Sequence, residues 1–527
     1  MTTSNGFDNE KYLTEQSRAI LERVAEFGDK LYLEFGGKLM FDFHAARVLP
    51  GYDSNVKIKL LQRLRDKIEI IFCVSAEDIA KGRMRGDFGI TYDVATLKSL
   101  DDLRSMDLPV TAVSINRFSG QPAALQLKNK VERRDVRVCL HGNIEGYPND
   151  VDRVVSDEGY GQNPYIETTR PIVIITGAGP GSGKMATALS QMYHDHRQGR
   201  LSGFAKFETF PIWCLSLEHP INLAYEAATA DIGDFNLVDP FHLSAYGVTA
   251  VNYNRDVENF PILRTIIERI LGAGGRVPRY RSPTDMGVNR AMEGIVDDGV
   301  VREAARQEII RRYFRYKWEY AIGVEKKETV ERLKALMQQI EVKPEHRKPV
   351  AASREAALQC EARGKGNRGV FCGAAIELDT GEIISGKNSP LLHSGSAAVL
   401  NAVKRLAGVP DNIDLLPAVV VENLTRLKRE VLGMSSESLD VSEILVALSI
   451  SSATNPLAEA AIKAIGRLRG REMHMTHIPS QGDQAGLRRL GLNLTTDAEL
   501  TPGGYFLRCV GQPLSGGLCM SRTNFRY

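Results

Sequence analysis

The chain has 527 residues, of which 43% are hydrophobic and 25% are charged, and its formal net charge is +2. These values exclude a largely disordered chain, a collagen-like fibre and a disulfide scaffold, and the length predicts two to four domains at roughly 100–200 residues each. So small a net charge supplies no global basic field for nucleic acid, and no apolar run approaches the ~20 residues of a membrane helix. We therefore expect neither a nucleic-acid partner nor a membrane partner.

The first ten residues lack the basic and apolar segments of a secretion signal. The seven cysteines are scattered and form no Cys-x-x-Cys pair, a usage typical of a reducing compartment. We therefore expect a cytoplasmic protein without a structural metal. Its size, together with a helical insert described below, favours a homo-oligomer.

Strands alternate with helices through the first half of the chain. Helical spacing of apolar residues predicts helices at 9–27, 57–67, 94–105, 123–133 and 184–196. Short continuous apolar runs predict buried parallel strands at 30–34, 68–74, 110–115, 136–140 and 171–176. This alternation predicts a three-layer α/β domain with a parallel sheet, which we place at residues 1–275.

The pattern changes in the second half. Charged stretches with helical periodicity, at 303–318 and 325–340, predict a helical insert, and a polar, proline-bearing linker at 342–349 completes the segment 276–350. A second α/β domain is predicted at 351–500. Its expected elements are strands at 370–377 and 382–385, a turn at 379–381, and helices at 395–406, 442–448 and 456–467. The tail, 501–527, is rich in Gly and Pro and is expected to be an arm or partly disordered.

The most informative motif follows the predicted strand at 171–176. From Ala178 the chain reads Ala-Gly-Pro-Gly-Ser-Gly-Lys, which fits the P-loop pattern up to Lys184. Glycines allow backbone amides to turn inward around an anion, and the following helix adds its positive end. The predicted phosphate site therefore consists of Gly179, Gly181, Ser182, Gly183 and Lys184, and Lys184 supplies mobile positive charge.

The motif departs from a full P-loop at the next residue. Met185 stands where Ser or Thr would bind Mg²⁺, and Thr187 lies about 200° around the helix, too far to replace that hydroxyl. The sequence thus predicts a small phosphorylated ligand, with a nucleotide as one cofactor candidate, and leaves the use of Mg²⁺ open. The alternative is a glycine-rich turn that serves close packing only.

Several polar residues downstream are candidate partners of this turn. Asp239 could hold a metal ion or act as a catalytic base, and helix capping is its alternative. Lys206 and Glu208 alternate along a strand and so face one side, where they would bind substrate or form a salt bridge. Asn252 and Arg255 are candidate substrate-binding residues, with hydrogen bonding within a loop as the alternative.

Eight strings spread along the chain resemble one bacterial family. They lie at 6–12, 33–38, 44–51, 147–151, 156–160, 179–187, 205–213 and 282–288. The chain is similar, over all but its last ~25 residues, to the family carried as domain of unknown function number eighteen-forty-six. In that family Met also follows the Lys of the glycine turn, which would make Met185 part of the family pattern. The resemblance implies a cytosolic, multidomain α/β protein and brings no substrate.

A second resemblance concerns the C-terminal domain. A strand pair followed by Leu-His-Ser-Gly at 392–395 is similar to the core of cytidine-deaminase-like domains, in which a helix opens with His-x-Glu. His393 matches the zinc histidine, but Gly395 replaces the catalytic glutamate and no Pro-Cys-x-x-Cys follows. The resemblance therefore implies a fold of deaminase-like topology without zinc chemistry. His393 is then a capping or substrate-contacting residue, or an ordinary buried polar residue.

Two functions of different class follow from these patterns. The first is an enzyme that binds a phosphorylated ligand or nucleotide at the glycine turn and performs phosphoryl transfer or ligation, with Lys184 and Asp239 as catalytic residues. The second is a non-catalytic metabolite-binding or scaffold protein with a degenerate deaminase-like domain.

Overall fold

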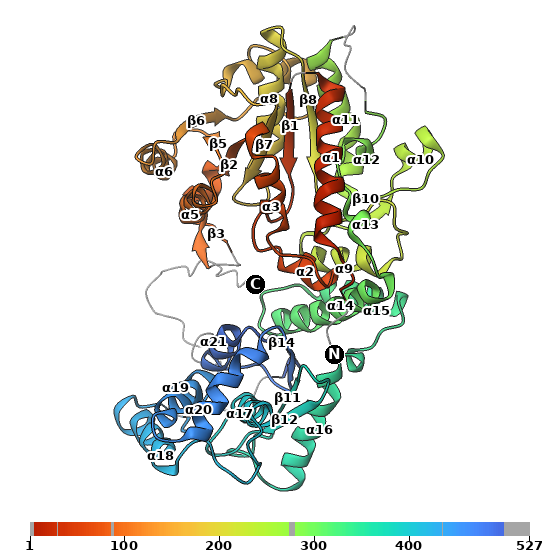
Figure 1. Ribbon diagram of the computed structural model, residues 1–527. Coiled ribbons are helices and arrows are strands. Elements are labelled where there is room, and N and C mark those ends of the chain that lie inside the picture. Colours follow the sequence, from red (N-terminus) through yellow and green to blue (C-terminus); the bar gives the residue numbers. More distant parts are fainter. Residues whose placement is uncertain (1–4, 29, 86–88, 273–279, 435, 500–527) are drawn as a thin grey trace. The chain divides into compact units, whose positions relative to one another are not determined.

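The computed structural model describes residues 5–28, 30–85, 89–272, 280–434 and 436–499. The predicted tail at 501–527 lies outside them. Backbone contacts divide the described chain into an N-terminal unit, residues 5–305, and a C-terminal unit, residues 306–499. Each unit is an α/β structure with its own sheet (Figure 1). No helix in the described part of the chain combines the length and the apolar character that crossing a bilayer requires.

The N-terminal unit is built on a six-stranded sheet in which every pairing is parallel. Its strands are β1 (Lys30–Phe35), β2 (Ile68–Ser75), β5 (Val110–Phe118), β6 (Arg137–Gly142), β7 (Ile172–Gly177) and β8 (Ser202–Phe207). β2 is buried along its whole length, as a strand covered on both faces should be. The predicted parallel α/β architecture is confirmed.

The N-terminal unit also contains thirteen α-helices, counted over the described residues, and two short antiparallel strand pairs. The helices are α1 (Asn9–Phe27), α2 (Phe43–Val48), α3 (Val56–Arg63), α4 (Ala76–Ala80), α5 (Tyr92–Ser105), α6 (Pro122–Glu132), α7 (Val151–Val154), α8 (Lys184–Arg197), α9 (Pro220–Ala228), α10 (Pro240–Tyr246), α11 (Asn254–Leu271), α12 (Pro283–Met286) and α13 (Ala291–Gly294). The short strand pairs are β3 (Met84–Arg85) with β4 (Ile90–Thr91), and β9 (Asn236–Val238) with β10 (Val251–Tyr253). Helix α14 (Asp298–Ala321) contains the boundary between the two units.

The alternation of side chains along β1 shows which helix covers each face of the sheet. Gly203 pairs with Leu31, and a Cβ atom at Gly203 would come within 2.1 Å of the Phe27 ring of α1. On the next residue of β1 the Tyr32 hydroxyl donates to Asp195 of α8 at 2.7 Å. Because successive side chains of a strand point to opposite faces, α1 and α8 cover opposite faces of the sheet. This arrangement is the predicted three-layer order.

The strand order makes the connections from β2 and β7 run in opposite directions. The order is β6-β5-β2-β7-β1-β8, so β2 and β7 are neighbours. The chain leaves β2 toward β5 on one side and leaves β7 toward β8 on the other. Where connections from adjacent parallel strands diverge in this way, a crevice opens at the carboxyl ends of the strands, and ligands bind there in open α/β sheets.

The C-terminal unit contains a four-stranded mixed sheet of order β12-β11-β13-β14. Its strands are β11 (Gly373–Glu377), β12 (Ile383–Lys387), β13 (Glu472–Met475) and β14 (Asn493–Thr496). Its helices are α15 (Lys327–Gln339), α16 (Lys348–Ala362), α17 (Ser394–Ala407), α18 (Ala418–Arg426), α19 (Val441–Ser452), α20 (Pro456–Ala464) and α21 (Gln481–Leu490). An apolar core formed mainly by small and branched side chains of α17, α19, α20 and the sheet holds these elements together.

Two predictions for the second half have clear outcomes in this unit. The strand pair 370–377 and 382–385 is present as β11 and β12, closed by the N–H of Gly381 on the carbonyl of Leu378. The segment 342–349 was predicted to be a linker throughout, and this prediction is wrong at its end, because α16 begins at Lys348. Pro349 lies in the first turn of that helix, where a missing N–H costs nothing.

Candidate functional site

The glycine turn directly follows β7, where the connections from β2 and β7 diverge. Gly181 and Gly183 adopt positive φ of 72° and 86°, and α8 begins at Lys184. The N–H of Ala178 donates to the carbonyl of Cys73 at 3.0 Å. The N–H groups of Gly179, Gly181, Ser182 and Gly183 donate to no acceptor within the described chain. The turn therefore presents backbone donors that its own fold leaves unused.

Asn116 at the end of β5 fixes the shape of this turn. Its side-chain amide donates to the carbonyl of Ser182 at 2.7 Å, and its Oδ1 accepts the hydroxyls of Thr187 and Ser114, each at 3.1 Å. A Cβ atom at Gly183 would lie 2.7 Å from the Asn116 side chain. Glycine is therefore required at 183 both by the left-handed backbone and by this close approach. Thr187, on the first turns of α8, faces Asn116.

Lys184 forms an incomplete ion pair at the start of α8. Its Nζ lies 3.9 Å from Oε1 of Glu34, which stands near the end of β1, and the two side chains are 17% and 14% exposed. Oε2 of Glu34 is buried and makes no hydrogen bond within the described residues. Both charged groups therefore lie at the carboxyl ends of the strands, a row of positions that we call the carboxyl edge. Each of the two groups can form further hydrogen bonds.

Lys206 and Glu208 lie at the end of β8, on the same face of the sheet as Glu34. Glu34 pairs in register with Lys206, so their side chains are neighbours. The ammonium of Lys206 is ion-paired with Asp256 at the start of α11. The Tyr253 hydroxyl donates to Oε1 of Glu208 at 3.1 Å. The predicted common face is thus observed, but the salt bridge of Lys206 goes to Asp256 and not to Glu208.

The surroundings of Glu208 raise the pKa of its carboxyl group. Burial raises its pKa first, and the negative charges of Asp256 and Glu34 raise it further. Lys206 and the Tyr253 hydroxyl act in the opposite direction, and the pKa settles at about 7. Burial alone would lower the pKa of Lys206, but Asp256, Glu34 and Glu208 outweigh it and raise that pKa, so Lys206 stays charged. A carboxyl group that titrates near neutrality is suited to proton transfer.

The other predicted site residues lie elsewhere. Asp239 caps α10: Oδ1 accepts the N–H groups of Phe241 and His242, and Oδ2 accepts the N–H and hydroxyl of Thr284. These four bonds support the capping alternative. The Asn252 amide lies 3.5 Å from the Thr284 hydroxyl.

Arg255 lies near the carboxyl edge, where its guanidinium pairs with Asp234. It forms an ion pair with Asp234 at 2.5 Å and stacks over the ring of Tyr253, 5.8 Å from its centroid. The same Tyr253 contacts both Arg255, through its ring, and Glu208, through its hydroxyl.

Sequence reasoning missed Glu34, Asn116, Tyr253 and Asp256. Glu34 and Asn116 share a usable signal, a polar side chain near the carboxyl end of a strand whose middle is mainly buried. Tyr253 and Asp256 flank the predicted Arg255, but nothing in the local pattern indicates that they face β8. No group of three or more His, Cys, Asp or Glu side chains in the described residues is arranged to hold a metal ion.

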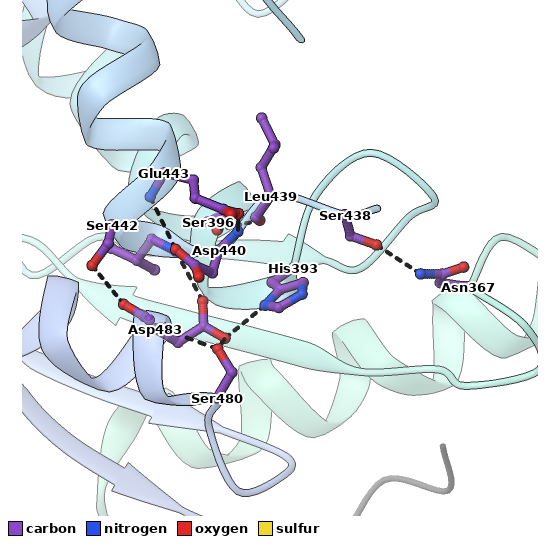
Figure 2. Close-up of polar contacts among 12 residues, drawn as sticks. Asn367, His393, Ser396, Ser438, Leu439, Asp440, Ser442, Glu443, Ser480 and Asp483 are labelled. Carbon is purple, nitrogen blue, oxygen red and sulfur yellow. Dashed lines mark hydrogen bonds and ion pairs between the residues drawn. The ribbon is translucent and has the colours of Figure 1, made fainter. Parts of the chain in front are cut away.

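His393 belongs to a separate polar network in the C-terminal unit (Figure 2). Its Nδ1 lies 2.7 Å from Oδ2 of Asp483, which also accepts the Ser480 hydroxyl at 2.8 Å. Oδ1 of Asp483 accepts the N–H of Val441 at 3.0 Å. Burial lowers the pKa of His393, but Asp483 outweighs it and the net shift is upward. The network ties together the first turns of α17, α19 and α21.

The fold is that of a two-unit α/β protein whose parallel sheet carries charged residues at the carboxyl ends of its strands. Family models assign it: residues 5–341 match "Domain of unknown function DUF1846, N-terminal" and residues 345–505 match the C-terminal domain of the same name. The chain belongs to the DUF1846 family, and the predicted resemblance is confirmed.

Proteins named "UPF0371 protein" are close relatives of this chain. One from Clostridium tetani (strain Massachusetts / E88) is 52% identical over 494 residues, covering 94% of this chain and 97% of the relative. Another, from Clostridium botulinum (strain Alaska E43 / Type E3), is 51% identical over 492 residues, covering 93% and 97%. The likeness therefore extends over both units.

Asn116→Ala should loosen the glycine turn. The substitution removes three hydrogen bonds and leaves the buried Thr187 hydroxyl without its acceptor, a loss of about 1–3 kcal/mol in the free energy of unfolding. Hydrogen exchange at residues 178–186 should become faster than in the wild type. The exposed Asn129 is the matched control, and Asn129→Ala should leave this exchange unchanged. Wild-type protection of residues 178–186 in Asn116→Ala would contradict the role of Asn116.

Glu208→Gln should change how stability depends on pH. Folding raises the pKa of Glu208 from about 4.5 to about 7, so the folded state holds this proton more tightly and loses stability as pH rises through that window. The loss should be about 1–3 kcal/mol, and glutamine abolishes it. Thermal unfolding should show this variant gaining on the wild type between pH 5 and pH 8. Glu22→Gln, at an exposed carboxylate of α1, should show no such gain, and parallel curves for wild type and Glu208→Gln would refute the shift.

Asp483→Ala should destabilise the C-terminal unit. Asp483 is almost fully buried and holds His393, Ser480 and the N–H of Val441, so its removal should cost about 3–5 kcal/mol. In a Trp213→Phe background, Trp318 fluorescence reports urea unfolding of this unit. Asp411→Ala, at an exposed side chain, serves as the control, and equal midpoints for the two variants would show that the network carries no stability.

Proposed function

We propose that this protein is an enzyme that binds a phosphorylated small molecule, with a nucleotide as the leading candidate, at the glycine turn and transfers its phosphoryl group or uses it for ligation. The observation that carries the proposal is the set of backbone N–H groups at Gly179, Gly181, Ser182 and Gly183 that have no acceptor in the described chain. Such donors, placed before a helix N-terminus, favour phosphate oxygens.

Three further features support this function. The turn stands at the crevice of the parallel sheet, which is the common ligand position in such folds. Lys184 follows the turn and has only a partial ion pair with Glu34, so its ammonium can approach an anion. Glu208, on the same edge, supplies a carboxyl group able to exchange a proton near pH 7.

The departures from a full P-loop shape the proposal. Met185 offers no hydroxyl, and Thr187 is bonded to Asn116, so we assign no metal ligand at this turn. Asp239, which the sequence suggested as a catalytic residue, has both oxygens occupied by its capping bonds and by Thr284. We therefore leave Asp239 out of the proposed machinery and keep Lys184.

A second function is favoured by the C-terminal unit. We propose that its deaminase-like topology carries no deaminase chemistry, because Gly395 replaces the glutamate and packs against Met475, and His393 is held by Asp483. A protein in which the N-terminal unit binds a metabolite without turnover, and this unit serves assembly, is the alternative function.

Binding of pyrophosphate, ATP, GTP and glucose 6-phosphate to the full chain tests the main function. At a concentration of 100 times Kd, a ligand that binds the folded state should stabilise it by about 2.7 kcal/mol, visible in thermal unfolding. Calorimetry should give Lys184→Ala an affinity at least 10-fold weaker, because the variant loses its charge contact with phosphate. Lys128→Ala, at a solvent-facing pair on α6, is the control.

Three outcomes have different meanings. Absence of binding by all four compounds, or unchanged affinity in Lys184→Ala, would overturn the phosphate site. Binding with release or transfer of phosphate, followed by ³¹P NMR, would support the enzyme. Tight binding without turnover would instead support the non-catalytic alternative.

A further inference from the structure

Glu208 stands across the carboxyl edge from the glycine turn. The strands between them run in the order β7-β1-β8, and the glycine turn follows β7 while Glu208 follows β8. Neighbouring strands are ~4.8 Å apart, so the two groups are separated by about 10 Å across the sheet. That span can hold a phosphoryl group at one end and a second reactant at the other.

The position of the Glu208 carboxylate is fixed by the main chain. A Cβ atom at Gly36 would lie 2.3 Å from Oε1 and 2.4 Å from Cγ of Glu208, so the side chain rests directly on this glycine. The N–H of Gly36 donates to the carbonyl of Phe207, which keeps the ends of β1 and β8 together. The Tyr253 hydroxyl holds Oε1 from the other side. Glu208 is nonetheless partly exposed and can meet a ligand.

Among the described residues, no cation forms an ion pair with Glu208. Lys206 is paired with Asp256, and Lys184 faces Glu34. The carboxyl groups of Glu34, Asp256 and Glu208 outnumber these two lysines, so a further anion is disfavoured beside Glu208. A reactant that carries a neutral hydroxyl fits these charges, and a carboxylate does not.

We propose that Glu208 is the catalytic base of the transfer reaction and that the acceptor is a hydroxyl compound bound beside Glu208 and Tyr253. This inference rests on the proposed function, because the donor is the phosphorylated ligand at the glycine turn. It adds the acceptor class and the residue that removes its proton. The Tyr253 hydroxyl, as donor to Oε1, is a positioning group.

The step balances with these two reactants alone. The acceptor O–H gives its proton to the Glu208 carboxylate as its oxygen forms a bond to phosphorus. The bond from phosphorus to the bridging oxygen of the donor breaks, and that oxygen keeps the electron pair. Lys184 and the N–H groups of the turn stabilise the negative charge that results. The proton then leaves Glu208 for solvent, to which this residue is partly exposed.

Transfer assays on the full chain test this inference. ATP and GTP serve as donors, and glycerol, glucose, ribose and myo-inositol as hydroxyl acceptors, with ethylamine and acetate as amine and carboxylate arms. ³¹P NMR identifies the product. The wild type should form a phosphate ester, and Glu208→Gln should be slower by about 10²-fold or more. The wild-type rate should rise with pH and level off near 7, and this rise should disappear in the variant.

Pyrophosphate calorimetry separates the two proposals. Glu208→Gln should bind pyrophosphate within about 3-fold of the wild type, since Glu208 stands apart from the N–H groups of the turn. Failure of the wild type to bind would defeat the proposed function itself. Wild-type binding with no ester formed from any hydroxyl compound, with an N-phosphorylated or acyl phosphate product only, or with an unchanged rate in Glu208→Gln, would overturn the base assignment alone.

Two further variants test the geometry directly. ¹³C NMR of glutamate-labelled protein, with Glu208→Gln to assign the signal, follows the titration of this carboxyl group. Tyr253→Phe removes a donor to the carboxylate and should move the titration to higher pH, whereas Asp256→Asn removes a nearby negative charge and should move it to lower pH. Glu132→Gln, at an exposed carboxylate of α6, is the control for both NMR and rate. A Glu208 signal already fully ionised at pH 5 would overturn the proposal.

Discussion

The position of β7 between β2 and β1 is the constraint on which the rest of the N-terminal unit depends. Because all six strands are parallel, their carboxyl ends meet along one edge, and the groups of the candidate site are brought together there. The glycine turn follows β7, Asn116 lies near the end of β5, Glu34 lies near the end of β1 and Glu208 follows β8. A different strand order would leave the same residues on the same strands without bringing them together.

Charge compensation along this edge is uneven. Lys206 and Asp256 form a close ion pair, whereas Lys184 and Glu34 are 3.9 Å apart. Within the described residues, the carboxylate of Glu208 accepts a hydrogen bond from the Tyr253 hydroxyl and has no ion-pair partner. Buried charges are normally paired, and incomplete pairing carries a cost in stability. Proteins keep such groups where binding or chemistry uses them, which is consistent with the proposal for this edge.

The sequence predicted the sheet well because parallel strands are buried on both faces and read as continuous apolar runs. The turn was found for a related reason, since closely spaced glycines directly after such a run are typical of a tight passage from strand to helix. Glu34 was not predicted to lie near Glu208, because that depends on β1 pairing with β8. Tyr253 and Asp256 were not predicted to face Glu208 either, because they lie on β10 and α11, and their approach to β8 is a tertiary contact. Asp239 illustrates an ambiguity that the sequence leaves open, because an acid before Pro-Phe-His suits a helix cap at least as well as a metal site, and its hydrogen bonds favour the cap.

Glu34 lies 3.9 Å from the Lys184 ammonium, beside which the proposed ligand would place its anionic group. Under that proposal, the protein's own carboxylate is a competitor, and the ligand must displace it or share the lysine with it. A group with two negative charges gains more from the same ammonium than chloride or acetate does. The proposed site would therefore select anions by charge density, through a residue that does not itself bind them.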